Sequence, residues 1–179
     1  MPLSATESDE TARDLTGRRR RFGHRLARLA TLWRREIDHD LRQFNLTDAT
    51  WRPLYYLRSL PSPVRQTDLA RALSVEAPSL VRVLDVLEKQ RLVSRDVDPD
   101  DRRSKLITLT PAGTVMADRV LRAADSVGER LLSDVSEEAL NQSLAVFDQV
   151  WSVLQEGRET DRIHPDARPV RSVSSNRTP

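Results

Sequence analysis

The chain has 179 residues, of which 38% are hydrophobic and only 4% aromatic, and its formal net charge at pH 7 is +2. This length allows one ordinary domain, or one compact lobe with an attached helical part. The absence of cysteine excludes disulfides, thiolate metal sites and sensing by thiol oxidation. No apolar run approaches the roughly 20 residues of a membrane span, and residues 1–13 lack a signal-peptide core, so the expected location is cytoplasmic.

The chain is expected to begin with a polar segment followed by a long helix. Residues 1–14 are acidic and have little to bury, which predicts disorder. Four consecutive arginines at positions 18–21 are either a solvated helix start or an arm that touches phosphates. Apolar residues then recur at helical spacing, which predicts an N-terminal dimerisation helix over residues 15–46. This stripe consists of Phe22, Leu26, Leu29, Trp33, Ile37, Leu41 and Phe44.

Residues 47–110 are expected to contain three short helices. The first starts after Thr47, which is a good N-cap, and the second has Leu69, Ala70 and Leu73 at helical spacing before a break at residues 74–75. Pro78 suits the first turn of the third helix, because its missing N–H would have no intrahelical partner there. The inward stripe of this third helix consists of Leu80, Leu84 and Leu87.

A β-ribbon is predicted after these helices. One strand ends near Val97, and the other returns over residues 106–109. The residues between them, 98–103, are charged and include a proline, so they form a tip rather than regular sheet. Helix, turn, helix and ribbon together make a winged helix-turn-helix.

Residues 111–157 are expected to form C-terminal dimerisation helices. The last one follows Ser136, and its apolar residues alternate in steps of four and three, as in a coiled coil. This seam consists of Leu140, Leu144, Phe147, Trp151 and Leu154. We expect this seam and the stripe of the first helix to join two copies as a homodimer; the alternative is that both pack within one chain. Residues 158–179 have no apolar period, which predicts a disordered basic tail.

The run from Gln66 to Thr110 resembles the MarR family of bacterial transcription regulators, near its SlyA-like branch. The motifs are A-P-S-L-V-R-V-L-D-V-L-E and D-D-R-R-S-K-L-I-T-L-T-P-A-G. The resemblance implies a mainly α (α+β) fold, a winged helix-turn-helix with long N- and C-terminal dimerisation helices. Two residues depart from the family pattern. Arg65 replaces the usual Ser or Thr N-cap, and Arg91 replaces a usual Gly, so the C-cap geometry there should differ.

The outward face of the helix from Pro78 is the predicted reading surface for double-stranded DNA. Arg82 is suited to a bidentate contact with guanine O6 and N7 in the major groove, and a valine can touch a thymine methyl. Backbone N–H groups at the helix start favour phosphate. The alternative for Arg82 is a surface salt bridge to Asp85 or Glu88. The candidates on this helix are Pro78, Ser79, Arg82 and Val83.

The wing supplies a second set of DNA-binding candidates. Arg103 is expected to enter a narrow, A·T-rich minor groove, where negative potential is concentrated. Asp101 would orient its guanidinium by a charge-assisted hydrogen bond, which matches the Asp-x-Arg wing of the family. Arg102 and Lys105 are phosphate candidates. The alternative is that the tip is only a solvated turn.

The resemblance also implies a small aromatic or anionic effector, bound between the DNA-binding lobe and the dimer helices. The candidates for lining this pocket are Trp33, Arg34, His39, Trp51 and Tyr55. The alternative is that these are core aromatics and surface charges.

Catalysis is not expected. The three histidines are not at metal-ligand spacing with carboxylates, and no glycine-rich phosphate loop or nucleophile elbow is present, so we predict neither enzyme activity nor a metal or cofactor. The predicted function is sequence-specific binding to a pseudo-palindromic operator by a ligand-responsive dimeric repressor. The alternatives are an architectural DNA-binding protein of low specificity and a helical protein-interaction module that does not bind DNA.

Overall fold

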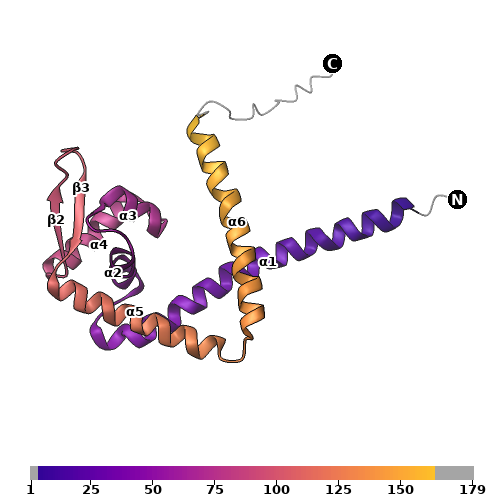
Figure 1. Cartoon of the computed structure of the whole chain (residues 1–179), viewed down its shortest axis with the longest axis horizontal. Helices are drawn as coiled ribbons and strands as arrows, with labels where there is room; N and C mark the ends of the chain where they lie inside the picture. Colours follow the sequence, from indigo (N-terminus) through magenta and orange to yellow (C-terminus); the bar gives the residue numbers. More distant parts are fainter. Residues whose placement is uncertain (1–3, 164–179) are drawn as a thin grey trace, which may run out of the picture. The chain divides into compact units, whose positions relative to one another are not determined.

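The computed structural model describes residues 4–163. The chain divides into two compact units, and the boundary along the sequence lies between Leu131 and Leu132. The first unit carries every element before the last helix, and the second carries that helix (Figure 1). The elements are α1 (Ser4–Leu41), a 3-10 turn η1 (Arg42–Phe44), α2 (Asp48–Ser59), β1 (Val64–Arg65), α3 (Gln66–Leu73), α4 (Ala77–Lys89), β2 (Val93–Val97), β3 (Lys105–Leu109), α5 (Pro111–Leu132) and α6 (Glu137–Ile163).

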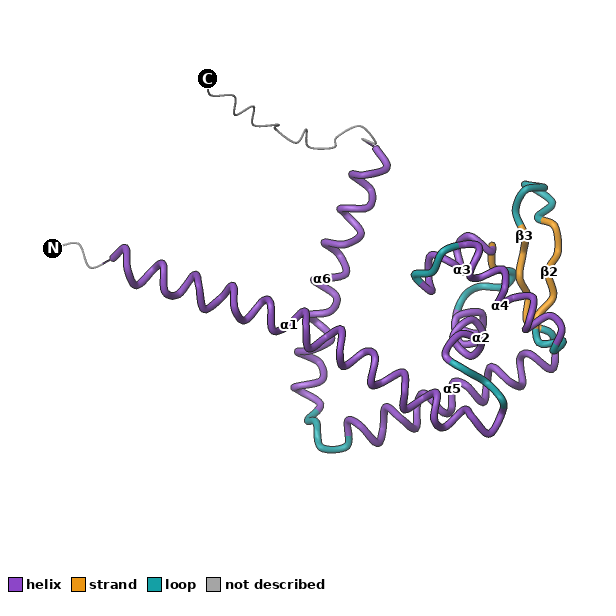
Figure 2. Tube along the Cα trace, turned by 180° about the vertical axis from the view of Figure 1, so that it is seen from behind, coloured by secondary structure: helices purple, strands orange, loops and turns teal. Residues whose placement is uncertain are grey.

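The predicted mainly helical winged helix-turn-helix is confirmed. A three-stranded antiparallel sheet has the order β1-β3-β2, with Ile107 of β3 paired to Val64 on one side and to Arg95 on the other. Strands β2 and β3 form the wing, and Figure 2 shows the loop at its tip. The helix-turn-helix consists of α3 and α4, whose short connection is residues 74–76.

The core of the lobe lies beneath the helix-turn-helix and the sheet. The inward stripe predicted for α4 is buried, and Ile107 at the centre of the sheet is fully buried with it. Helices α1 and α5 contribute to the same core through Leu41 and Val120, both inaccessible to solvent. Burying an aliphatic side chain of this size stabilises the fold by roughly 1.5–3 kcal/mol. These contacts fix α4 and the wing on one framework.

The end of α4 corrects one expectation from the sequence. The N–H of Leu92 donates to the carbonyl of Leu87 at 2.9 Å, and the N–H of Arg91 donates to that of Glu88 at 2.8 Å. This is a Schellman motif, and Arg91 occupies its left-handed position with φ of 57°. The prediction of a different C-cap geometry was therefore wrong. A left-handed backbone costs a residue with a side chain about 1 kcal/mol. The two hydrogen bonds and the burial of Leu92 outweigh this cost.

The start of α3 agrees with the sequence. Arg65 is the N-cap residue, in extended conformation, and its side chain makes no capping hydrogen bond. Thr47 is the N-cap of α2, as expected, and its N–H donates to the Thr50 hydroxyl at 2.9 Å.

Two helices extend further than the sequence predicts. Helix α1 begins at Ser4, within the segment expected to be disordered, because residues 4–16 contain no glycine or proline and their acids favour the positive end of a helix. Helix α6 continues through Gly157 to Ile163, since a single glycine weakens a helix without ending it. The rest of the predicted tail, residues 164–179, lies outside the described residues. No helix between residues 4 and 163 has the length and hydropathy needed to span a bilayer.

Candidate nucleic-acid interface and effector cavity

The outward face of α4 is open to solvent. Its first turn places Pro78 and Ser79 at the surface, and Arg82 is exposed one turn later. Pro78 is in the first turn, as predicted, and removes no intrahelical bond. Val83 is different, because its side chain is half-buried against the core. The exposed face of α4 therefore carries Arg82, with the half-buried Val83 at its edge.

The acids that follow Arg82 on α4 form ion pairs with a different arginine, Arg95. The Nη2 atom of Arg95, on β2, lies 2.6 Å from the Asp85 carboxylate and 2.5 Å from that of Glu88. These two hydrogen bonds, with Glu88 the stronger partner, raise the pKa of Arg95 above its ordinary value. Within the described residues, Arg82 has no ion pair or side-chain hydrogen bond. The salt bridge considered for Arg82 from the sequence is instead made by Arg95.

A buried carboxylate organises the tip of the wing. Asp98 is 2% exposed, and its Oδ1 accepts the N–H of Asp100 at 3.0 Å. Its Oδ2 accepts a hydrogen bond from Nε of Arg65 at 2.8 Å. The backbone hydrogen bond from Asp100, followed by the bond and charge of Arg65, lowers the pKa of Asp98, against the opposing effect of burial. This ion pair was not predicted from the sequence.

The predicted wing cations all lie at the surface. Arg102, Arg103 and Lys105 are exposed at or beside the tip. Asp101 acts differently from the prediction, because its Oδ1 accepts the backbone N–H of Arg103 at 3.0 Å. Within the described residues no bond joins Asp101 to the Arg103 guanidinium. A short carboxylate two residues upstream reaches the backbone more easily than the end of a long side chain, as in an Asx-turn. Asp101 thus shapes the tip and leaves the guanidinium free.

Four of the five residues predicted for an effector pocket line one cavity of about 380 Å³. These are Trp33, Arg34, Trp51 and Tyr55. His39 is the exception: it is exposed and lies outside the lining. His39 lies five positions after Arg34 in α1, and a rotation of roughly 100° per residue turns it well away from the cavity. The cavity is also lined by residues that were not predicted from the sequence, namely Ala30, Ile37, Arg52, Tyr56 and Ala124.

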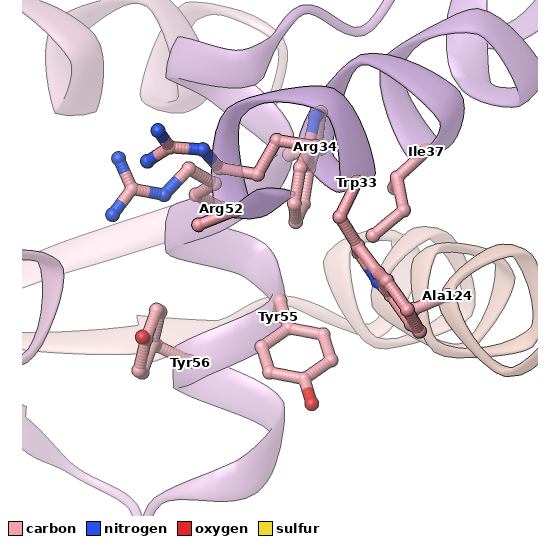
Figure 3. Close-up of a pocket in the computed structure, with 9 residues that line it drawn as sticks. Trp33, Arg34, Ile37, Arg52, Tyr55, Tyr56 and Ala124 are labelled. Carbon is pink, nitrogen blue, oxygen red and sulfur yellow. The ribbon is translucent and has the colours of Figure 1, made fainter. Parts of the chain in front are cut away.

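The cavity offers hydrogen-bond donors and no carboxylate. Figure 3 shows the side chains of Arg34 and Arg52 extending in the same direction above the two tyrosines. Nη2 of Arg52 donates to the carbonyl of Leu73, the last residue of α3, at 2.8 Å. The indole Nε1 of Trp51 is buried and has no hydrogen-bond partner in the described part of the chain. No group of acidic, histidine or cysteine side chains suited to a metal occurs among the described residues.

Comparison with known proteins matches residues 44–104 to the MarR family. The solved structure of transcriptional regulator PA3341 is 34% identical over 75% of this chain and 98% of its own, with a TM-score of 0.70. The chain belongs to the MarR family. S. aureus MepR, solved in complex with DNA, is 28% identical over 74% of this chain and 97% of its own, with a TM-score of 0.66. CouR from Rhodococcus jostii RHA1, solved with p-coumaroyl-CoA, shares the fold at 21% identity, covering 72% of this chain and 90% of its own (TM-score 0.64).

Membership of the MarR family confirms the function predicted from the sequence, that of a DNA-binding transcription regulator. The family match runs from η1 to the tip of the wing, so it contains Arg82, Asp101 and Arg103. All of α1, β3, α5 and α6 lie outside it. Placement in the SlyA-like branch stays a prediction.

Proposed function

We propose that this MarR-family chain is a dimeric regulator that reads a pseudo-palindromic operator with α4 in the major groove and the wing in the minor groove. The observation that carries the proposal is the open face of α4, on which Arg82 pairs with no side chain that the structure describes while Arg95 holds the neighbouring acids. A cation without an internal partner can form the bidentate contact with guanine that gives base discrimination.

The start of α4 would contact the phosphate backbone. Backbone N–H groups around Pro78 and Ser79 lie at the positive end of the helix, where phosphate is favoured. The Ser79 hydroxyl is exposed and can reach a phosphate or a base edge. Val83 is half-buried, so its contribution would be limited to contact with a thymine methyl at the edge of the surface.

The wing would read groove shape. Arg103 is exposed, and its backbone is held by Asp101, which supports insertion into a narrow A·T-rich minor groove. Arg102 and Lys105, on either side of it, would neutralise phosphates. Because these contacts are electrostatic, they add affinity that falls steeply as the salt concentration rises.

Two exposed apolar faces support dimerisation. On α6, Trp151 is 61% exposed and Leu154 is 56% exposed, although both belong to the predicted seam. The predicted stripe on the N-terminal part of α1 is exposed at Phe22. Residues 18–35 contain eight arginines and no acid, whereas residues 137–156 contain four acids and no basic residue. Burial of apolar area and opposite charges both favour contact of α1 of one copy with α6 of a second copy.

The cavity would hold a small aromatic anion as effector. Its aromatic lining and its two guanidinium groups suit a planar ring that carries a carboxylate. The ligand of CouR, p-coumaroyl-CoA, has both an aromatic ring and anionic groups. Occupation of the cavity would weaken DNA binding and so relieve repression. Benzoate titrated into the protein should quench tryptophan fluorescence, and Arg34→Gln should weaken this binding.

The remaining parts of the proposal follow from the regulator role. A protein that acts on the chromosome of a bacterial cell works in the cytoplasm, and we propose that location. The proposed DNA contacts involve no chemical reaction, so the protein is proposed not to be an enzyme. No cofactor is required for either groove contact.

Selection of bound DNA from a random pool, followed by gel-shift titration at fixed salt, tests the proposal. A sequence-specific regulator should bind the selected palindrome at least about a thousandfold more tightly than random duplex. Equal binding to both would favour an architectural protein instead. Absence of binding even at low salt would favour a protein-interaction module, because non-specific electrostatic binding should then be visible.

A further inference from the structure

Arg65 occupies a position with two structural functions. It is the N-cap residue of α3, and as part of β1 it pairs with Leu106 of β3. Its side chain leaves the α3 N–H groups uncapped and forms an ion pair with Asp98. A Ser, Thr, Asn or Asp at an N-cap stabilises a helix by about 1 kcal/mol relative to Ala, so Arg65 forgoes that stabilisation.

The ion pair spans the sheet. Strand β3 lies between β1 and β2, and Asp98 directly follows the last residue of β2. Arg65 therefore joins one outer strand to the end of the other. Within the described residues, the Arg65 side chain forms its ion pair with Asp98. The nearby Asp68 forms an ion pair with Arg71 instead, at 2.7 Å.

Asp98 transmits this constraint to the tip. One of its oxygens binds Arg65, and the other binds the backbone N–H of Asp100. The N–H of Asp98 donates to Ser104 O at 3.2 Å, and the N–H of Ser104 donates to Asp101 O at 2.8 Å. The backbone that carries Arg103 is thereby linked, through a buried carboxylate, to the first helix of the helix-turn-helix.

We propose that Arg65 is a positioning residue for DNA binding: its ion pair with the buried Asp98 fixes the wing tip relative to α3, so that Arg103 is presented in one orientation to the minor groove. The proposal rests on the wing contact described under Proposed function. A preorganised tip has less conformational entropy to lose when DNA binds, which is how a residue without its own base contact raises affinity.

The experiment compares Arg65→Ala, Asp98→Asn and the double variant with wild type. Asp98→Asn keeps an oxygen that can accept the Asp100 N–H but removes the charge that binds Arg65. Two readouts are used: the ratio of affinities for operators with A·T-rich and G·C-rich flanks, and hydrogen–deuterium exchange over residues 98–104. Each single variant should lose about tenfold in that ratio, equivalent to roughly 0.7 kcal/mol at each of two wings, and should exchange faster at the tip.

The control is Arg122→Ala, which removes the same charge from an exposed position on α5 without touching the wing or the acids near Arg65. It should leave both the ratio and the exchange at their wild-type values. Arg65→Lys, which keeps the charge but has a different donor geometry, should retain part of the ratio. The double variant should be no worse than either single variant, because both remove one ion pair.

An unchanged affinity ratio in Asp98→Asn would overturn the positioning role, because any effect of Arg65 would then come from its own charge on DNA. Faster exchange without a change in the ratio would overturn it equally. Arg103→Ala tests the proposed wing contact by itself. If that variant flattens the ratio while Asp98→Asn does not, the positioning role fails and the proposed function stands. If Arg103→Ala leaves the ratio intact, the minor-groove contact itself is wrong, and the positioning role falls with it.

Discussion

The Nη2 atom of Arg95 lies 2.5 Å from the Oε2 atom of Glu88, and this ion pair joins strand β2 of the wing to the last turn of α4. Both side chains are partly exposed, so the pair itself contributes only about 0.2–1 kcal/mol to stability. Its larger effect is on the charge of the reading face. Together with the Arg95–Asp85 ion pair, it neutralises the two acids that follow Arg82 on α4.

Arg95→Ala should therefore weaken DNA binding although Arg95 has no assigned contact with DNA. The variant frees the carboxylates of Asp85 and Glu88, which then repel phosphate and compete for Arg82. Affinity should fall, and the salt dependence of binding should change with it. Arg95→Ala combined with Asp85→Asn and Glu88→Gln should recover much of the loss in a gel-shift titration. A triple variant as weak as Arg95→Ala would show that Arg95 contacts DNA directly.

Arg91→Gly should stabilise the protein. Arg91 holds φ of 57°, where an L-residue carries a steric cost that glycine lacks. The greater entropy of glycine in the unfolded chain offsets part of the gain, so the free energy of unfolding should rise by roughly 0.5–1 kcal/mol. Urea denaturation measures the change. Gln90→Gly is the control, because φ is −77° at that position, and it should destabilise the protein.

Stability near the wing should depend on pH through Asp98. Its folded-state pKa is lowered, chiefly by the Asp100 N–H and then by Arg65. A group with a lowered folded pKa contributes stability above its unfolded pKa and loses it as the pH falls through the folded value. Wild type should therefore exceed Asp98→Asn in stability at pH 7, and the difference should shrink below about pH 4. A gap that stays constant down to pH 2 would rule out ionised Asp98 as its source.

The dimer should depend on α6. Replacing Trp151 with Glu places a charge in the proposed apolar interface, and two symmetric copies should weaken association by about 3 kcal/mol, or roughly a hundredfold. Analytical ultracentrifugation gives the dissociation constant. Gln149→Glu is the control, since it adds the same charge at an exposed polar position. Deleting residues 136–179 should give monomers or aggregates, and a truncated protein that sediments as a stable dimer would disprove the interface.

Local patterns in the sequence predicted most of the fold. The stripes of α3 and α4, the strand ends and the N-cap at Thr47 follow from spacing and residue type, and the structure has each of them. The glycine of the L-T-P-A-G motif also has a physical reason, because a Cβ at Gly113 would lie 1.8 Å from the carbonyl oxygen of Leu92. The geometry of the helix ends was harder to predict from the sequence. Arg91 adopts a left-handed conformation that is stabilised by the surrounding hydrogen bonds and not by its residue type.

Long-range partners could not be predicted in this way. Arg65 and Asp98 are 33 residues apart, and nothing in their local sequence indicates that they meet. Likewise, Arg52 and Tyr56 join the cavity only because α2 packs beside α1. His39 was assigned to the cavity by residue type although its helical phase points elsewhere. The sequence indicates which charged residues lie at the surface, whereas the structure is needed to show which of them form ion pairs within the protein.

Arg82→Ala gives the most direct test of the reading face. Arg82 is exposed on α4 and has no internal partner within the described residues, so its removal should leave the folded dimer unchanged. Loss of one bidentate contact with guanine should reduce discrimination by roughly 1–3 kcal/mol in each half-site and relax base choice at one symmetric pair of positions. Binding to random duplex should fall far less, because phosphate contacts dominate there. Repeating the selection from a random pool with the variant shows the relaxed positions directly, and Arg122→Ala, an exposed arginine on α5, is the control. Wild-type affinity and base preference in Arg82→Ala would mean that α4 does not enter the groove in the proposed orientation.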